Sequence, residues 1–216
     1  MSRLTRAGVV AVAAVTALLL TGCGDADGGA AQVPGVGEGG SSDTPEPEPE
    51  PDDDAANDGV DRPRIELPEG ISAVYEGWES EDPTEQRVLS DARAAQNAVD
   101  LAIVEHEPQA DYVGFYHAAE ALVDTEEWIA GFVRNDLTIT GTIRYVDPEV
   151  TPSGDDQALV AYCADESGAV ASDVGTGEEQ PDSASPYVAY RNTLQRDDRG
   201  VWVTVLVHTE RGQCTR

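Results

Sequence analysis

His117 is the residue whose type and neighbours come nearest to a catalytic group. It follows Asp111, Tyr112 and Tyr116 in the chain, and an imidazole beside a carboxylate serves as a general base when both face one pocket. An imidazole that is hydrogen-bonded at the surface, near the start of a helix, explains the same residues without any chemistry. We therefore treat Asp111, Tyr112, His117 and Trp202 as candidate pocket residues and leave both interpretations open.

Other motifs that carry chemistry are absent from the sequence. It contains no Gly-x-Ser-x-Gly elbow, no His-Glu-x-x-His pair, no P-loop and no glycine-rich dinucleotide turn. His106 lies between Glu105 and Glu107, which suggests a metal site, but adjacent residues on a helix point in different directions and one imidazole makes a poor zinc site. We predict no catalytic residue, no metal and no cofactor, so the chain is not expected to be an enzyme.

Residues 1–23 have the features of an export signal. Arg3 and Arg6 precede an uncharged, mostly apolar run over 7–20, which is too short for a membrane-spanning helix of about 20 residues. The run ends in Leu20-Thr21-Gly22-Cys23, which resembles the lipobox of bacterial lipoproteins. The resemblance implies cleavage between Gly22 and Cys23 and attachment of fatty acids, such as palmitate, at the Cys23 sulfur. An ordinary secretory signal with a chance cysteine is the alternative.

The remaining cysteines form an even pair. Of three cysteines, assigning Cys23 to the lipid leaves Cys163 and Cys214. An extracytoplasmic compartment permits a disulfide between them, and closing so long a loop would stabilise the fold by about 4 kcal/mol. A thiol pair in a metal or redox role is the alternative, although the sequence has no Cys-x-x-Cys spacing.

The charge of the chain excludes some partners. The sequence has 42 acidic and 13 basic residues, a formal net charge of −29, and all of its basic residues are arginine. A surface of this charge repels nucleic acid and anionic lipid headgroups. We therefore expect no nucleic-acid partner, and membrane association only through the lipid anchor.

Composition divides the chain into a leader at 1–22, a linker at 23–64 and a domain at 65–216. The linker is rich in glycine, proline and acids, and its Pro-Glu repeat at 45–51 favours extended polyproline II. We interpret it as a disordered acidic spacer between a lipid anchor and the domain. Low-complexity sequence under no length demand is the alternative.

Two helices are expected in the domain. Asp82, Pro83 and Glu85 form a helix start, apolar residues follow at helical spacing to about His106, and Pro108 ends the helix. A second helix is predicted over 117–134, with Trp128 in its buried stripe. The segment 65–78 has no clear period and is expected to lie extended against the domain, with Trp78 as a candidate cap over a pocket mouth.

Beyond the helices the hydrophobic period changes to two, which predicts strands at 138–146, 157–164, 187–196 and 201–208, with a shorter strand at 169–174. In the last of these, Trp202 and His208 are predicted on one face, opposite a row of valines. Helices followed by strands, without alternation, predict an α+β fold with an antiparallel sheet of four to five strands and two main helices.

This order of elements resembles the nuclear-transport-factor-2-like cone domains, and more narrowly the uncharacterised lipoproteins of high-GC actinobacteria. The resemblance rests on Tyr162-Cys163-Ala164-Asp165-Glu166, residues 190–194 and Gly200-Val201-Trp202-Val203 followed by Cys214. It implies a curved sheet that encloses a pocket, lined by tyrosines such as Tyr162, Tyr187 and Tyr190. No catalytic residue follows from it.

Together these features predict a lipoprotein on the extracytoplasmic face of the cell membrane. We expect a non-catalytic binding or interaction module that meets another envelope protein through its sheet or cone mouth. A small-ligand binder or an enzyme that uses His117 and Asp111 in the cone cavity is the alternative, and a purely structural envelope protein is a third. A cavity that contains both side chains would favour the second.

Overall fold

The computed structural model describes residues 58–181 and 185–214. The predicted leader, Cys23 and most of the predicted linker lie outside the described residues. The described elements are, in order, β1 (Ile71–Glu76), α1 (Pro83–Glu105), α2 (Asp111–Tyr116), α3 (Ala119–Arg134), β2 (Leu137–Pro152), β3 (Gln157–Asp173), β4 (Tyr187–Arg196) and β5 (Trp202–Arg211). No helix in these residues is both long and apolar enough to span a membrane.

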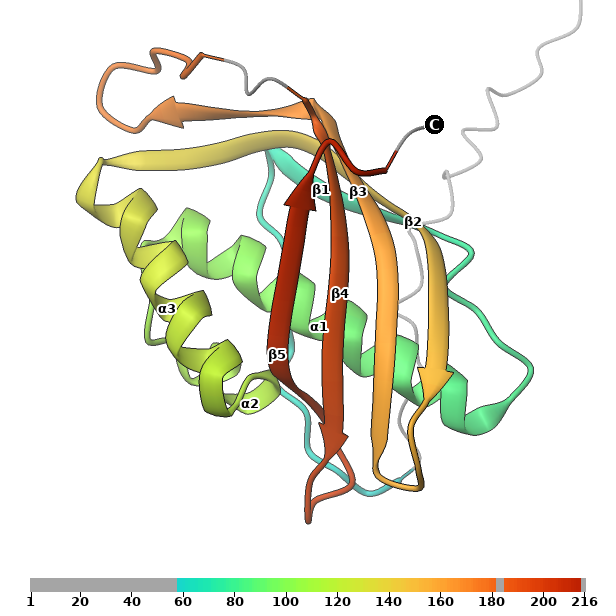
Figure 1. The fold of residues 1–216 in the computed structure, drawn as a ribbon. Coiled ribbons are helices and arrows are strands. Elements are labelled where there is room, and N and C mark those ends of the chain that lie inside the picture. The colour runs from blue at the N-terminus through green and yellow to red at the C-terminus, as the bar shows by residue number, and fades with distance from the viewer. Residues whose placement is uncertain (1–57, 182–184, 215–216) are drawn as a thin grey trace, which may run out of the picture. The chain divides into compact units, whose positions relative to one another are not determined.

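The five strands form one curved sheet in the order β1-β2-β3-β4-β5. Strands β2 to β5 pair antiparallel with their neighbours in the chain, as predicted, while β1 pairs parallel with β2 at the edge. α1 crosses behind the sheet and α3 lies beside β5 (Figure 1). The predicted α+β fold with a curved sheet is confirmed, and the segment without a clear period supplies the edge strand.

The start of α1 follows its sequence signal. The Asp82 carboxylate accepts hydrogen bonds from the backbone N–H groups of Thr84 and Glu85, each at 2.9 Å. Pro83 occupies the first turn, and the helix ends at His106 in a left-handed conformation. The cap fixes where this helix begins and therefore which of its residues face the sheet.

Strands β2 and β3 are longer than predicted because they continue through a bend. Their outer parts, Leu137–Thr142 and Gly168–Asp173, pair with each other and form a two-stranded arm that turns across the end of α3 (Figure 1). At the bend Gly141 has a φ of +97°, and a Cβ there would collide with the carbonyl oxygen of Gly168. The two glycines thus allow the backbones to approach closely enough to curve the sheet.

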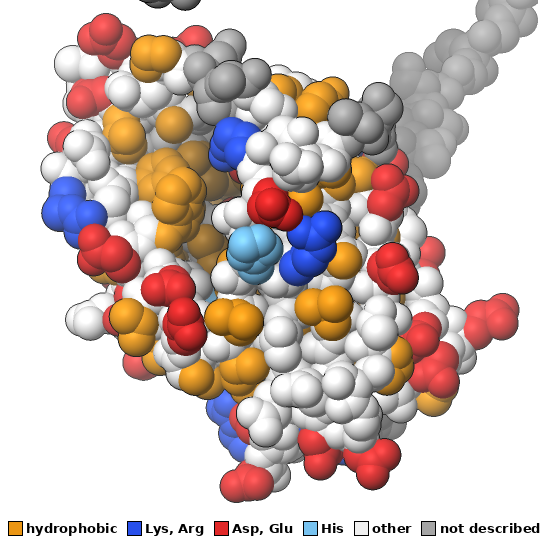
Figure 2. Space-filling view, in the orientation of Figure 1, with side chains coloured by type: hydrophobic (Ala, Val, Ile, Leu, Met, Phe, Trp, Pro, Cys, Tyr) orange, Lys and Arg blue, Asp and Glu red, His pale blue; other side chains and the backbone are white. Residues whose placement is uncertain are grey.

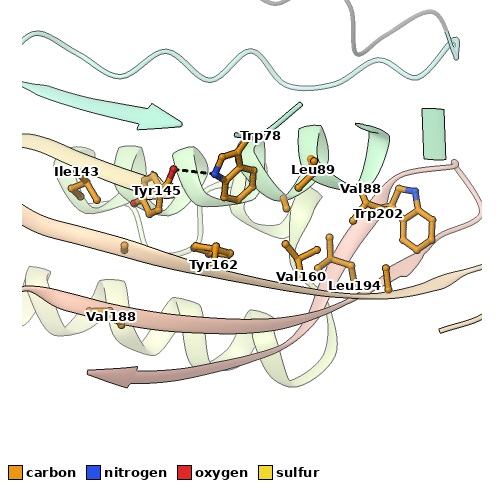
Figure 3. Packing of buried hydrophobic residues seen from close by; sticks show 13 residues of the cluster. Trp78, Val88, Leu89, Ile143, Tyr145, Val160, Tyr162, Val188, Leu194 and Trp202 are labelled. Atoms are coloured by element: carbon orange, nitrogen blue, oxygen red, sulfur yellow. Dashed lines mark hydrogen bonds between the residues drawn. The ribbon is translucent and has the colours of Figure 1, made fainter. Parts of the chain in front are cut away.

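The main core lies between α1 and the concave face of the sheet. Trp78 is buried there against Tyr75 and Tyr162, and its indole N–H donates to the Tyr145 carbonyl at 3.0 Å (Figure 3). The prediction that Trp78 caps a pocket mouth is wrong, because its ring fills the space between α1 and the sheet.

Residues before Ile65 also pack on the domain. Arg62 donates through Nε to the Asp91 carboxylate at 2.8 Å, and Asp91 also accepts the backbone N–H of Trp202. Asp91 is only 1% exposed, so the Arg62 guanidinium neutralises a carboxylate that is buried in α1. The packed part of the chain therefore begins before the boundary at residue 65 that composition suggested.

The predicted disulfide is confirmed. Cys163 in β3 is bonded to Cys214, with 6.0 Å between their Cα atoms. Cys214 follows β5, and β4 lies between β3 and β5 in the sheet. The bridge therefore ties the end of the chain across the sheet to its central strand.

Candidate functional site

A cavity of about 780 Å³ lies between the helices and the concave face of the sheet. α1 and α3 form one wall, and strands β2 to β5 form the other. Its mouth appears in Figure 2 as a hollow lined by hydrophobic side chains between α3 and β5. A cavity of this size is in the range that encloses small organic molecules.

The floor of the cavity holds a buried carboxylate. Asp100 on α1 is 3% exposed, accepts a hydrogen bond from the Tyr145 hydroxyl at 3.0 Å and accepts another from the Gln96 amide at 3.4 Å. Burial raises its pKa from 3.8 to about 7, against the lowering effect of these two hydrogen bonds. Near neutral pH this group can therefore be charged or neutral.

A line of polar groups extends from Asp100 along the floor. The Gln96 carbonyl accepts from the Tyr162 hydroxyl at 3.0 Å, and Tyr162 accepts from the Asn192 amide nitrogen at 3.3 Å. Asn192 is 7% exposed, and its side-chain oxygen has no hydrogen-bond partner. An unsatisfied buried acceptor is costly, so this atom marks a place where a ligand donor would be stabilising.

His117 lies in the wall of the same cavity, and not at the surface. The predicted second helix is interrupted here: α2 ends at Tyr116, and His117 and Ala118 are extended against β5, where the Ala118 N–H donates to the Thr204 carbonyl at 2.9 Å. The His117 Nδ1 is 3.1 Å from the Val113 carbonyl. Burial lowers the pKa of His117 to about 4, so the ring is neutral at physiological pH.

The other candidate pocket residues do not join His117. Asp111 is exposed at the start of α2, Tyr112 donates to the Glu105 carboxylate at 2.5 Å, and neither lines the cavity. Trp202 is buried in the main core beside Leu194, outside the cavity lining (Figure 3). The hypothesis of an acid–base pair of His117 and Asp111 is therefore wrong, because the two side chains lie in different environments.

A bulge in β5 changes which of its residues face the cavity. Thr204 pairs with Leu194 and Leu206 pairs with Thr193, so Val205 is an extra residue in the strand. Thr204 lines the cavity before the bulge, and Val207 lines it after. Strict alternation therefore predicts the wrong face for His208, which is exposed and lies near Glu210, and which does not line the cavity.

Two aromatic residues of α3 line the cavity. Trp128 was predicted in a buried stripe, but it is 58% exposed and packs edge-to-face on Phe132 at a ring distance of 5.4 Å. Both residues line the cavity. An exposed aromatic ring at the cavity wall is suited to serve as a platform for a ligand. Of the three predicted tyrosines, Tyr190 lines the cavity, Tyr162 is in the core beneath it, and Tyr187 does neither.

The described residues contain no group of three or more His, Cys, Asp or Glu side chains that could hold a metal ion. The His106 Nε2 is 2.8 Å from the Leu137 carbonyl, so this imidazole joins the end of α1 to the start of β2. A structural hydrogen bond accounts for its position.

Gln96 and Asp100 are two site residues that are absent from the predictions and could have been found from the sequence. They fall four and eight positions after Ala92, on the face of α1 that also carries Val99 and Ile103. Two polar residues within an apolar helical stripe are a detectable signal, because burying them requires partners or a ligand.

No family model matches the chain, and no curated protein matches it. Among solved structures, the chain is similar to the intermembrane space region of the chloroplast protein ARC6, with 13% identity over 62% of this chain and 99% of that chain and a TM-score of 0.44. It is also similar to a ketosteroid isomerase-like protein from Erwinia carotovora atroseptica, with 14% identity over 59% and 95% of the two chains and a TM-score of 0.42. An NTF-2 like protein of unknown function from Shewanella oneidensis has 10% identity over 56% and 96% and a TM-score of 0.34. Similarity at this level concerns the course of the chain and says nothing about activity.

Proposed function

We propose that this protein is a lipid-anchored lipoprotein of the extracytoplasmic face of the cell membrane whose domain binds a small ligand in its cavity without catalysis. The observation that carries the binding role is the cavity of about 780 Å³, whose lining combines apolar and aromatic side chains with polar and charged ones, among them the buried Asp100, His117 and Asn192. Pockets of this construction are typical of sites that enclose and orient organic molecules. A non-catalytic role is favoured because Asp111 is exposed and away from His117.

Binding of the fluorescent dye Nile red, an uncharged apolar probe, tests the cavity. Val207 on β5 lines the cavity, while its neighbour Leu206 is exposed and does not. We expect the full chain to bind Nile red, Val207→Trp to weaken binding at least about tenfold by filling the space, and Leu206→Trp to leave it unchanged. Equal binding by the two variants would show that the dye does not enter the cavity.

Metabolic labelling with a fatty acid tests the anchor. The lipobox resemblance implies acylation of Cys23, so we expect the wild-type chain in membranes to carry the label and Cys23→Ser to carry none. Labelled Cys23→Ser protein would contradict the assignment. Labelling of Cys163→Ser with Cys23 intact is the control for a general effect of losing a thiol.

An envelope protein as partner is a second candidate, favoured by exposed apolar side chains on α3. Val123 is 65% exposed, and Trp128, five residues further along the same helix, is 58% exposed. Exposed apolar groups that gather on one helix are typical of contact surfaces. A photo-crosslinking residue at position 123 should capture a partner in intact cells, while one at the exposed Glu107 should not.

A further inference from the structure

We infer that the cavity selects an organic cation, an apolar body that ends in a protonated amine, over neutral or anionic molecules of the same shape. The inference rests on the proposed binding role of the cavity and adds to it the chemical class of the ligand.

The first argument is the use of hydrogen-bond donors at the floor. The Asn192 amide donates to Tyr162, Tyr162 donates to Gln96, Gln96 donates to Asp100, and Tyr145 also donates to Asp100. Each of these donors points along the floor toward the carboxylate. A ligand therefore meets the Asp100 carboxylate and the Asn192 side-chain oxygen as acceptors, while both tyrosine hydroxyl protons and one N–H of each amide are already engaged.

The second argument is the set of acceptors that remain. The Asn192 side-chain oxygen has no hydrogen-bond partner. If the amide were reversed, the amide nitrogen would be the atom without a partner, and the Tyr162 hydroxyl would lose the N–H group that donates to it. Because the Nδ1 of neutral His117 donates to the Val113 carbonyl, its Nε2 carries a lone pair in the cavity wall. An ammonium group, with three donors and no acceptor, matches such surroundings.

The third argument is charge. Among the described residues that line the cavity, the carboxylates are Asp100, Asp124 and Glu166, and the guanidinium is Arg211. Arg211 binds Glu166 at 2.8 Å, which leaves the charges of Asp100 and Asp124 unbalanced. A ligand cation beside Asp100 would supply the counter-charge that a buried carboxylate lacks.

The walls supply the contact for the rest of the ligand. Trp128, Phe132 and Ile139 line the cavity together with Val207, and the first of these is largely exposed without a ligand. An aromatic or aliphatic body would cover these groups, and the aromatic rings also attract cations over their faces. An inorganic cation would leave this surface uncovered, so the geometry favours an organic one.

Three naphthalene compounds of nearly equal shape test the inference: 2-naphthylmethylamine, 2-naphthylmethanol and 2-naphthoate. Each displaces Nile red from the full chain carrying Cys23→Ser, which prevents uptake of the probes by the fatty acids. We expect the amine to bind about tenfold more tightly than the alcohol, since hydrogen bonds to charged groups are about twice as strong as neutral ones. The naphthoate should bind most weakly.

Asp100→Asn removes the charge while keeping the shape of the side chain. We expect the preference for the amine over the alcohol to fall to within about threefold in this variant. Asp111→Asn removes an exposed carboxylate that does not line the cavity, and should keep the full preference. This control separates the local effect of Asp100 from the change in overall charge.

A pH series on the wild-type chain gives a second measurement that needs no variant to fold. The titratable groups around Asp100 are Tyr75, Tyr145, Tyr162, Tyr190 and Glu166, and burial raises the pKa of all four tyrosines, so these stay neutral from pH 6 to 8. Ionisation of Asp100 over this range should increase the ratio of amine to alcohol affinity several-fold.

The outcomes distinguish this inference from the proposed function. Equal affinity for the three compounds, a preference for the naphthoate, or a preference for the amine that Asp100→Asn and pH leave unchanged would overturn the cation selectivity while leaving the binding cavity in place. Failure of Nile red itself to bind would overturn both.

Discussion

At the scale of single residues, the cavity wall holds Asp100 and His117, two buried groups that titrate below about pH 7 and whose effects on stability oppose each other. The pKa of Asp100 is raised by burial to about 7, and that of His117 is lowered by burial to about 4. The folded protein therefore binds a proton at Asp100 more tightly than the unfolded chain does, and a proton at His117 less tightly. Each group favours its neutral form for the same physical reason, the low polarity of its surroundings.

The signs give a first prediction. Stability contributed by the protonated Asp100 is present below pH 3.8 and is lost as pH rises to about 7, while stability from neutral His117 is lost as pH falls from 6.5 to about 4. One pKa unit corresponds to about 1.4 kcal/mol, so each effect amounts to a few kcal/mol and the two largely cancel between pH 4 and 6.5.

Variants at the two positions separate these effects. Relative to wild type, the free energy of unfolding of Asp100→Asn should rise as pH increases from 4 to 6.5, and that of His117→Asn should fall. Urea unfolding at several pH values measures both, and the comparison with wild type removes the contribution of the acidic surface. Parallel curves for the three proteins would contradict the pKa directions.

At the scale of elements, the sequence predicts what local pattern determines. The start of α1 at Asp82 and the period-two strands appear as expected, because capping and alternation depend on neighbouring residues. The pairing of β1 with β2 joins residues about 70 positions apart, and the bulge at Val205 depends on its partner strand. Neither leaves a local signal, and for that reason the sequence predicts Trp202 as the pocket residue of β5, while Thr204 and Val207 line the cavity instead.

The candidate site was less predictable than the fold for the same reason. The residue type of His117 marks it as a candidate, but the sequence indicates only its near neighbours in the chain as partners. Its cavity partners come from elsewhere: Asp100 from α1, Tyr145 from β2 and Asn192 from β4. These residues are brought together by the packing of α1 against the curved sheet, which no local pattern in the sequence encodes.

A second prediction concerns that curvature. Gly141→Ala places a methyl group against the Gly168 carbonyl at a positive φ, so we expect a loss of at least about 2 kcal/mol in the free energy of unfolding and weaker Nile red binding. Gly114→Ala is the control: it lies in α2 with open space around its Cβ, and should be neutral or stabilising by up to about 1 kcal/mol. Similar stability of the two variants would mean that the bend tolerates a side chain.

At the scale of the whole molecule, the disulfide connects the fold to the compartment in which the chain is proposed to function. The bridge of Cys163 and Cys214 spans β4 and closes a loop with a sequence separation of 51. Such a loop constrains the unfolded chain strongly, and the bond persists only where the surroundings are oxidising. The disulfide is thus compatible with the proposal that the protein is exported.

The third prediction follows from this dependence. Replacing both cysteines, Cys163→Ala with Cys214→Ala, should lower the free energy of unfolding by about 2–4 kcal/mol, chiefly because the unfolded chain gains freedom. Dithiothreitol should lower the stability of the wild type by a similar amount and leave the double variant unaffected, which is the internal control. Trapping of free thiols in intact cells should find both residues oxidised in the exported protein. Free thiols at both positions in intact cells, or a double variant as stable as wild type, would show that the disulfide does not stabilise the protein in the cell. One of the two arguments for an extracytoplasmic location would then be lost.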